Sequence, residues 1–115
     1  MGRMFYGMTE QAIEMEDRLL AHVQSVVLTK LRRGESFSIS WKHDGESVRE
    51  TIWVHSSIPL RIVLDDADAG SIDRDILVRL VEAANSNRGM DLSSEALADM
   101  ECAIAESRVE MARAA

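Results

Sequence analysis

The sequence predicts an α+β fold, with a small antiparallel sheet of about five strands, helices that cover it and a C-terminal helical extension. Several segments alternate apolar and polar residues with a period of two, a pattern typical of strands. Others repeat apolar residues every three or four positions, a pattern typical of helices. Strands that follow one another through short turns pair antiparallel, so the expected order is β-β-α-β-β-β-α-α.

Length and composition limit the classes of protein that the chain can be. Its 115 residues are enough for one domain with its own core, and a net charge of −7 argues against a general binder of polyanions. The single cysteine cannot form an internal disulfide and suits a reducing compartment. No signal sequence or membrane-spanning apolar stretch is recognisable, so we expect a cytoplasmic protein that does not bind membranes.

The clearest helix is expected over residues 17–33. Its apolar residues gather on one helical face: Leu19, Leu20, Val23, Val26, Val27 and Leu31. Asp17 is the expected N-cap and Gly34 the expected left-handed stop, while basic residues in the last turn complement the helix dipole. We expect the apolar face to pack on the apolar side of the strand that follows.

A β-hairpin is expected directly after this helix. Phe37, Ile39 and Trp41 alternate with polar residues, and Asp44-Gly45 is typical of a two-residue type I′ turn. That turn sets three pairs opposite each other: Trp41 with Val48, Phe37 with Ile52, and Ile39 with Glu50. The last pair puts an acidic residue on the apolar face, which a bulge or a longer loop would avoid.

Shorter patterns define the remaining elements. Further strands are expected at residues 4–6, 12–15 and 60–64, and further helices at residues 72–84 and from Ser93 or Ser94 to about Ala112. Ser71 is the expected cap of the second helix. We expect a single α+β domain over residues 1–92. Residues 93–115 then form a C-terminal helix that either packs on this domain or is used in oligomerisation.

An ordered series of short motifs resembles a family of small actinobacterial proteins of unknown function that automated annotation often labels "ATP-dependent DNA ligase". The motifs are Gly2, Phe5-Tyr6-Gly7, Asp17-Arg18-Leu19-Leu20-Ala21-His22, Lys30-Leu31-Arg32-Arg33-Gly34-Glu35, Ser40-Trp41, Ile52-Trp53-Val54-His55, Ile58-Pro59-Leu60 and Ala84-Asn85-Ser86. The resemblance covers about residues 1–92 and implies no catalytic residues. The helical tail beyond Leu92 is longer than the family pattern.

One motif invites an enzymatic interpretation. Lys42-His43-Asp44-Gly45 matches the Lys-x-Asp-Gly signature in which nucleotidyltransferases carry an adenylated lysine. The alternative is a charged strand end followed by a type I′ turn, which explains all four residues. A ligase also needs a larger nucleotide-binding domain, so we expect no catalytic residues and no cofactor.

Candidate metal ligands do not form a convincing set. Asp65, Asp66 and Asp68 lack the alternation and the distant glutamate of a calcium loop. His22, His43 and His55 share no ligand spacing with one another or with Cys102. We therefore expect no metal site, with His22 at the flank of its helix and Cys102 as a small, partly buried residue.

Two sets of residues carry the candidate functions. Nucleic acid would be contacted by the basic side chains of Lys30, Arg32, Arg33, Lys42 and Arg49, although the first three equally complement a helix dipole. A second copy of the chain would be contacted by Leu97, Met100, Ile104 and Met111, which equally suit a core. The preferred hypothesis is a non-catalytic domain that binds protein, itself included as a homodimer. The alternative is a DNA-associated accessory protein.

Overall fold

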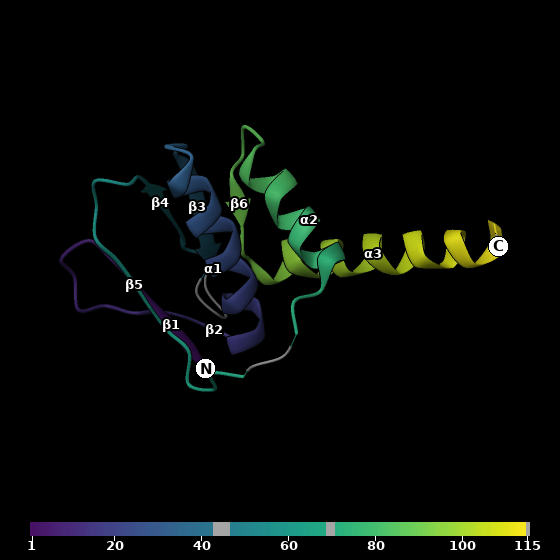
Figure 1. Ribbon diagram of the computed structural model, residues 1–115, viewed down its shortest axis with the longest axis horizontal. Helices are drawn as coiled ribbons and strands as arrows, with labels where there is room; N and C mark the ends of the chain where they lie inside the picture. Colours follow the sequence, from purple (N-terminus) through teal and green to yellow (C-terminus); the bar gives the residue numbers. More distant parts are fainter. Residues whose placement is uncertain (43–46, 69–70, 115) are drawn as a thin grey trace.

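The computed structural model describes residues 1–42, 47–68 and 71–114 and has the α+β fold expected from the sequence (Figure 1). Its strands within these ranges are Gly2–Tyr6 (β1), Ile13–Met15 (β2), Phe37–Lys42 (β3), Arg49–Val54 (β4), Leu60–Val63 (β5) and Met90–Asp91 (β6). Its helices are Asp17–Arg32 (α1), Arg74–Ala84 (α2) and Ser94–Ala114 (α3). The C-terminal helical extension is therefore present.

The strands form two sheets rather than the single sheet expected. One sheet has the order β2-β1-β5, and all its pairings are antiparallel. The other has the order β4-β3-β6, in which β6 pairs parallel to β3. After β4 the chain forms β5, which pairs with β1, a strand far away in sequence. Strand β6 is too short to show an alternating pattern. Neither pairing has a local signal.

The register of the β3–β4 hairpin differs by two residues from the one expected. Phe37 pairs with Val54, Ile39 with Ile52, Trp41 with Glu50, and Lys42 with Arg49. The ladder ends at Lys42 and Arg49, so the connection from β3 to β4 is longer than a two-residue turn. A longer loop is the alternative that avoids placing Glu50 opposite Ile39. The Asp44-Gly45 turn itself lies outside the described residues. A shift of two keeps every side chain on its expected face.

Helix α1 ends as expected but begins differently. Gly34 has a φ of +71°, and the N–H groups of Gly34 and Glu35 donate to the carbonyls of Leu31 and Lys30, which is a Schellman motif. Asp17, the expected N-cap, is instead the first helical residue. Its carboxylate accepts from the backbone N–H groups that follow β5, those of Asp65 and Asp66. It joins two segments rather than capping one.

The apolar face of α1 lies in the core, as its spacing predicts. Leu20, Val23, Val26 and Val27 are buried in one cluster with Phe37 and Ile39 of β3 and Met4 of β1, and Leu31 and Trp41 pack against it. His22 was expected at the flank but is only 1% exposed. Its Nε2 accepts from the backbone N–H of Asp73 at 2.8 Å, so Nδ1 carries the proton and donates to the carbonyl of Arg18 at 2.7 Å.

Helix α2 starts two residues later than expected for a Ser71 cap, because Asp73 is the N-cap. The Asp73 carboxylate accepts from the N–H of Asp75 and forms an ion pair with Arg108 of α3 at 3.1 Å. Burial, the largest single influence, raises the pKa of Asp73, but its hydrogen bonds and the charge of Arg108 outweigh this and lower the pKa below its ordinary value. Asp73 thus fastens α2 to both neighbouring helices.

Helix α3 begins where expected and has two distinct halves. The hydroxyl of Ser93 accepts from the N–H of Ala96 at its start. Leu97 and Met100 pack against the core, and Ile104 is buried. Beyond Ile104 the helix leaves the body of the molecule, with the C-terminus at its far end and α2 beside its first half (Figure 1). The long dimension of the molecule is accordingly 50 Å, against 35 and 32 Å for the others.

Candidate functional site

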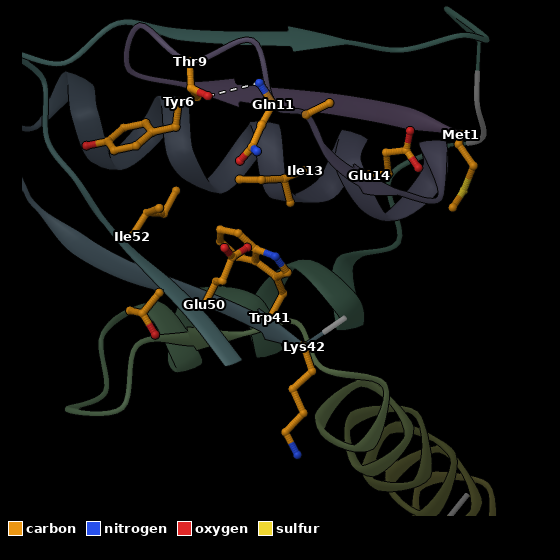
Figure 2. Close-up of a pocket in the computed structure, with 12 residues that line it drawn as sticks. Met1, Tyr6, Thr9, Gln11, Ile13, Glu14, Trp41, Lys42, Glu50 and Ile52 are labelled. Atoms are coloured by element: carbon orange, nitrogen blue, oxygen red, sulfur yellow. Dashed lines mark hydrogen bonds between the residues drawn. The ribbon is translucent and has the colours of Figure 1, made fainter. Parts of the chain in front are cut away.

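An open cleft of about 940 Å³ lies between the two sheets. Its lining comes from the N-terminal strands and their connection on one side and from the β3–β4 hairpin on the other (Figure 2). The lining residues are Met1, Tyr6, Thr9, Gln11, Ala12, Ile13, Glu14, Trp41, Lys42, Glu50, Thr51 and Ile52. A concave site of this size with mixed apolar and polar walls is the best candidate for binding on the described part of the chain.

The hairpin wall follows from the period of two along β3 and β4. Trp41, Glu50 and Ile52 share the face of this sheet that carries Phe37 and Ile39. Phe37 and Ile39 are buried, whereas Trp41 and Ile52 are half-buried and Glu50 is exposed. The apolar face therefore continues past the end of the core and becomes the wall of the cleft.

The opposite wall is formed by β1, β2 and the segment between them. In Figure 2, Ile13 lies across the cleft from the indole of Trp41, and Gln11 extends its amide toward the same space. The hydroxyl of Tyr6 donates to the carbonyl of Trp53 and accepts from the N–H of His55 at 3.2 Å. Because Tyr6 belongs to one sheet and β4 to the other, this hydroxyl joins the two sheets beside the cleft.

The sequence does not predict this cleft, although one of its residues is unusual in the sequence pattern. Glu50 is an acidic residue on an apolar face, which a bulge or a longer loop would avoid in the expected register. The corrected register keeps Glu50 on that face and sets it opposite Trp41 at the open end of the strands. A carboxylate at the end of an apolar stripe was therefore the available signal for a cleft.

The lysine of the Lys-x-Asp-Gly motif borders the cleft, but its amino group points away from it. The Nζ of Lys42 lies 2.9 Å from the Glu95 carboxylate of α3, and its side chain leads away from the cleft in Figure 2. His43, Asp44 and Gly45 lie outside the described residues. A lysine whose amino group pairs with an exposed carboxylate on a helix lacks the enclosed pocket that an adenylated lysine needs.

We therefore expect the purified protein to form no covalent adenylate with ATP and magnesium. The measurement is incorporation of labelled adenosine phosphate into the protein band, with Lys42→Ala as the matched control. Label that appears in the native protein and disappears in Lys42→Ala would contradict the expectation and support ligase-type chemistry.

The five basic residues proposed for nucleic acid lie in two separate groups. Lys30 is only 7% exposed, and its Nζ bonds to Glu35 at 3.0 Å and to the side chain of Asn85. Arg32 and Arg33 are exposed beside it. Lys42 and Arg49 are cross-strand neighbours at the other end of the β3–β4 ladder. Five residues of β3 separate Lys42 from Phe37, which lies near the end of α1. Five residues of strand span about 17 Å.

Arg49 is already held by acidic and polar groups. It lies 3.2 Å from the carboxylate of Asp91 and donates to the hydroxyl of Ser40 at 3.1 Å. Burial, the largest influence, raises the pKa of Asp91, but hydrogen bonds from Ser93 and the neighbouring Arg49 outweigh it and lower the pKa. Asp91 is therefore a carboxylate at neutral pH, and it ties β6 to β4.

The four residues proposed for a dimer interface are also divided. Leu97 and Met100 pack against the core and Ile104 is buried, whereas Met111 is 70% exposed on the projecting half of α3. Cys102, expected to be partly buried, is exposed on the same helix. The outward face of α3 thus carries side chains that the domain itself does not cover.

No metal centre and no membrane span emerge from the described residues. Within them, no three histidine, cysteine or acidic side chains come close enough to share an ion. Asp65 instead pairs with Arg3 at 2.8 Å, and Asp66 accepts from the N–H of Asp68. None of the described helices combines the length and the apolar character needed to cross a bilayer.

Comparison with known proteins adds one match. A family model described as a domain of unknown function, DUF7882, matches residues 1–95, which is most of the chain. No curated protein and no solved structure matches. The matched range includes both sheets, α1, α2 and the cleft, but only the first two residues of α3.

Proposed function

We propose that this chain, which belongs to the DUF7882 family, is a non-catalytic cytoplasmic domain that acts by binding protein, including a second copy of itself. The observation that carries the homodimer proposal is the projecting half of α3. Val109 and Met111 are 50% and 70% exposed there, beyond the last residue of the helix that is buried, Ile104. Apolar side chains on a helix outside the body of a protein are typical of an interface.

The length of α3 supports this proposal. A helix of 21 residues is about 31 Å long, and about half of that length extends past Ile104. A free helical segment shorter than about 12 residues is marginal in water unless something packs on it. Arg108 provides one anchor, through its ion pairs with Asp73 and Asp75, but Val109 and Met111 beyond it are 50% and 70% exposed. A partner helix would cover that part of α3.

Charge favours a second copy in the antiparallel orientation. The exposed face of α3 carries Ala98, Cys102, Ala105, Val109 and Ala112, alternately three and four residues apart. If two copies pair antiparallel about Ala105 and Val109, Arg113 of each copy comes beside Glu101 of the other. Opposite charges that flank an apolar seam set partner choice and orientation in helix pairs.

The test is the mass of the protein in solution, measured by light scattering over a range of concentrations. We expect a dimer for the native chain and a monomer for the double variant Ala105→Glu, Val109→Glu, because the glutamates would put like charges opposite each other in the antiparallel seam. Met8→Glu is the matched control, since Met8 is 93% exposed on another part of the molecule and should leave the mass unchanged.

Point variants are preferable to removal of the tail. Deletion after Leu92 would also remove Leu97 and Met100, which pack against the core, and the buried Ile104, so a lost dimer could reflect a damaged fold. A native chain that stays monomeric at high concentration would refute the homodimer. A dimer that survives the double glutamate variant would move the interface to a sheet or to α1.

DNA association is the second proposal, and Arg32 and Arg33 are what favours it. Both are exposed at the end of α1, and neither forms an ion pair with another described residue, unlike Lys30, Lys42 and Arg49. Retention on DNA that falls steeply with salt, and that Arg32→Ala with Arg33→Ala abolishes, would support this proposal. Equal retention of the native and double-alanine proteins on DNA would contradict this second proposal.

A further inference from the structure

We propose that the cleft between the two sheets binds an organic cation, namely a guanidinium or alkylammonium group on a short aliphatic stem. The proposal goes beyond the homodimer, because the cleft is built from β1–β4 and lies apart from the projecting half of α3. It rests on three properties of the lining: an aromatic face, a surplus of negative charge and apolar surface beside both.

The aromatic face is the indole of Trp41. Trp41 is half-buried at the end of the apolar face of β3, and its ring borders the cleft in Figure 2. The face of an indole attracts a cation through the ring quadrupole, and more strongly so where water is partly excluded. Ile13 across the cleft and Ile52 on the same wall supply apolar surface for the stem of such a ligand.

The charges of the lining favour a cation over an anion. Its two carboxylates are Glu14 on β2 and Glu50 on β4. Its cationic groups are already neutralised by carboxylates that do not line the cleft: Lys42 pairs with Glu95 at 2.9 Å, and the amino group of Met1 with Asp65 at 3.3 Å. Glu14 therefore leaves negative charge in the lining, because its carboxylate makes no hydrogen bond or ion pair with any other described residue.

The polar rim suits the hydrogen-bonding needs of an ammonium or guanidinium group. Such groups have several N–H donors and no acceptor, so they need oxygen atoms around them. Thr9 and Gln11 add oxygen acceptors to the Glu14 carboxylate around the cleft. A volume of about 940 Å³ also leaves room for more than the cationic group, such as the backbone of a peptide that carries it.

Titration calorimetry with matched probes tests the proposal. The probes are agmatine, as a free guanidinium compound, the peptide acetyl-Gly-Arg-Gly-amide, and the same peptide with citrulline in place of arginine. Citrulline keeps the shape of the arginine side chain but has no charge. We expect binding of the arginine peptide, weaker binding at high salt, and no binding of the citrulline peptide. If agmatine binds as tightly as the arginine peptide, the ligand is a small molecule. If the arginine peptide binds and agmatine does not, the ligand is a protein segment.

Two variants place the binding in the cleft. Trp41→Leu should weaken binding of the arginine peptide about tenfold, and Glu14→Gln should weaken it several-fold. Glu14 is exposed, so Glu14→Gln does not disturb the core and stays informative even if Trp41→Leu unfolds. Trp53→Leu is the control, because Trp53 lies on the opposite face of β4 and is 59% exposed. Failure of both cationic probes to bind, equal binding of the citrulline peptide, or unchanged binding by Glu14→Gln would each overturn the proposal.

Discussion

Val27→Asp is expected to lower the free energy of unfolding by about 4 kcal/mol or more, because it buries a charge that has no partner. Val27 is 0% exposed on the core face of α1, within the cluster that contains Phe37 and Ile39. A domain of this size has a total stability of about 5–15 kcal/mol, so this loss is enough to leave much of the protein unfolded. Denaturant unfolding followed by circular dichroism measures the change.

Leu28→Asp is the matched control for this prediction. Leu28 is the next residue on the same helix, but it is 42% exposed, so an aspartate there remains in contact with water. We expect Leu28→Asp to cost no more than about 1 kcal/mol. Equal losses in the two variants would show that the helix rather than its packing had been damaged, and an unchanged Val27→Asp would refute the assignment of this face to the core.

Gly89→Ala is expected to cost about 3 kcal/mol, combining a steric clash with backbone strain. Gly89 precedes β6, and the parallel pairing of Met90 with Ile39 brings it against Ser38. A Cβ atom on Gly89 would lie 1.9 Å from the Oγ of Ser38 and 2.7 Å from its backbone carbonyl oxygen. The hydroxyl can rotate, but the carbonyl is part of the backbone of β3, so β6 has to move away from β3.

Gly34→Ala separates the two contributions. Gly34 has almost the same backbone angle as Gly89, with φ values of +71° and +74°, but no atom lies within 4 Å of its would-be Cβ. Its substitution should therefore show only the strain of a left-handed alanine, about 1 kcal/mol. Thermal or denaturant unfolding of both variants tests this difference. If Gly34→Ala and Gly89→Ala cost the same, the close approach of β6 to β3 is not present in solution.

The properties that depend on neighbours along the chain follow from the sequence alone. The spacing of Leu20, Val23 and Val27 placed one face of α1 in the core, and Gly34 marked the end of this helix. The period of two placed Ile39 and Glu50 on the same face of the hairpin. Each of these follows from the helical or strand repeat and from the conformational freedom of glycine, so no distant contact has to be known.

Contacts between distant segments are set by the folded chain, and several side chains have other roles there than their local sequence predicts. Asp17 binds the backbone after β5 instead of capping its own helix, and His22 is buried because Asp73 donates to it. Lys30 is held by Glu35 and the distant Asn85, rather than exposed to phosphate. Polar groups bond to whichever partner folding brings near, and that choice leaves no periodic trace in the sequence.

The cleft shows the same division between sequence and tertiary structure. The hairpin pattern alone put Trp41 and Glu50 on one face, but the opposing wall comes from β1 and β2, which belong to another sheet. The sequence could not place that wall because the β1–β5 pairing joins strands that are distant along the chain. Such pairings depend on how well whole surfaces fit each other, so only the folded chain fixes where the two sheets separate and leave a site.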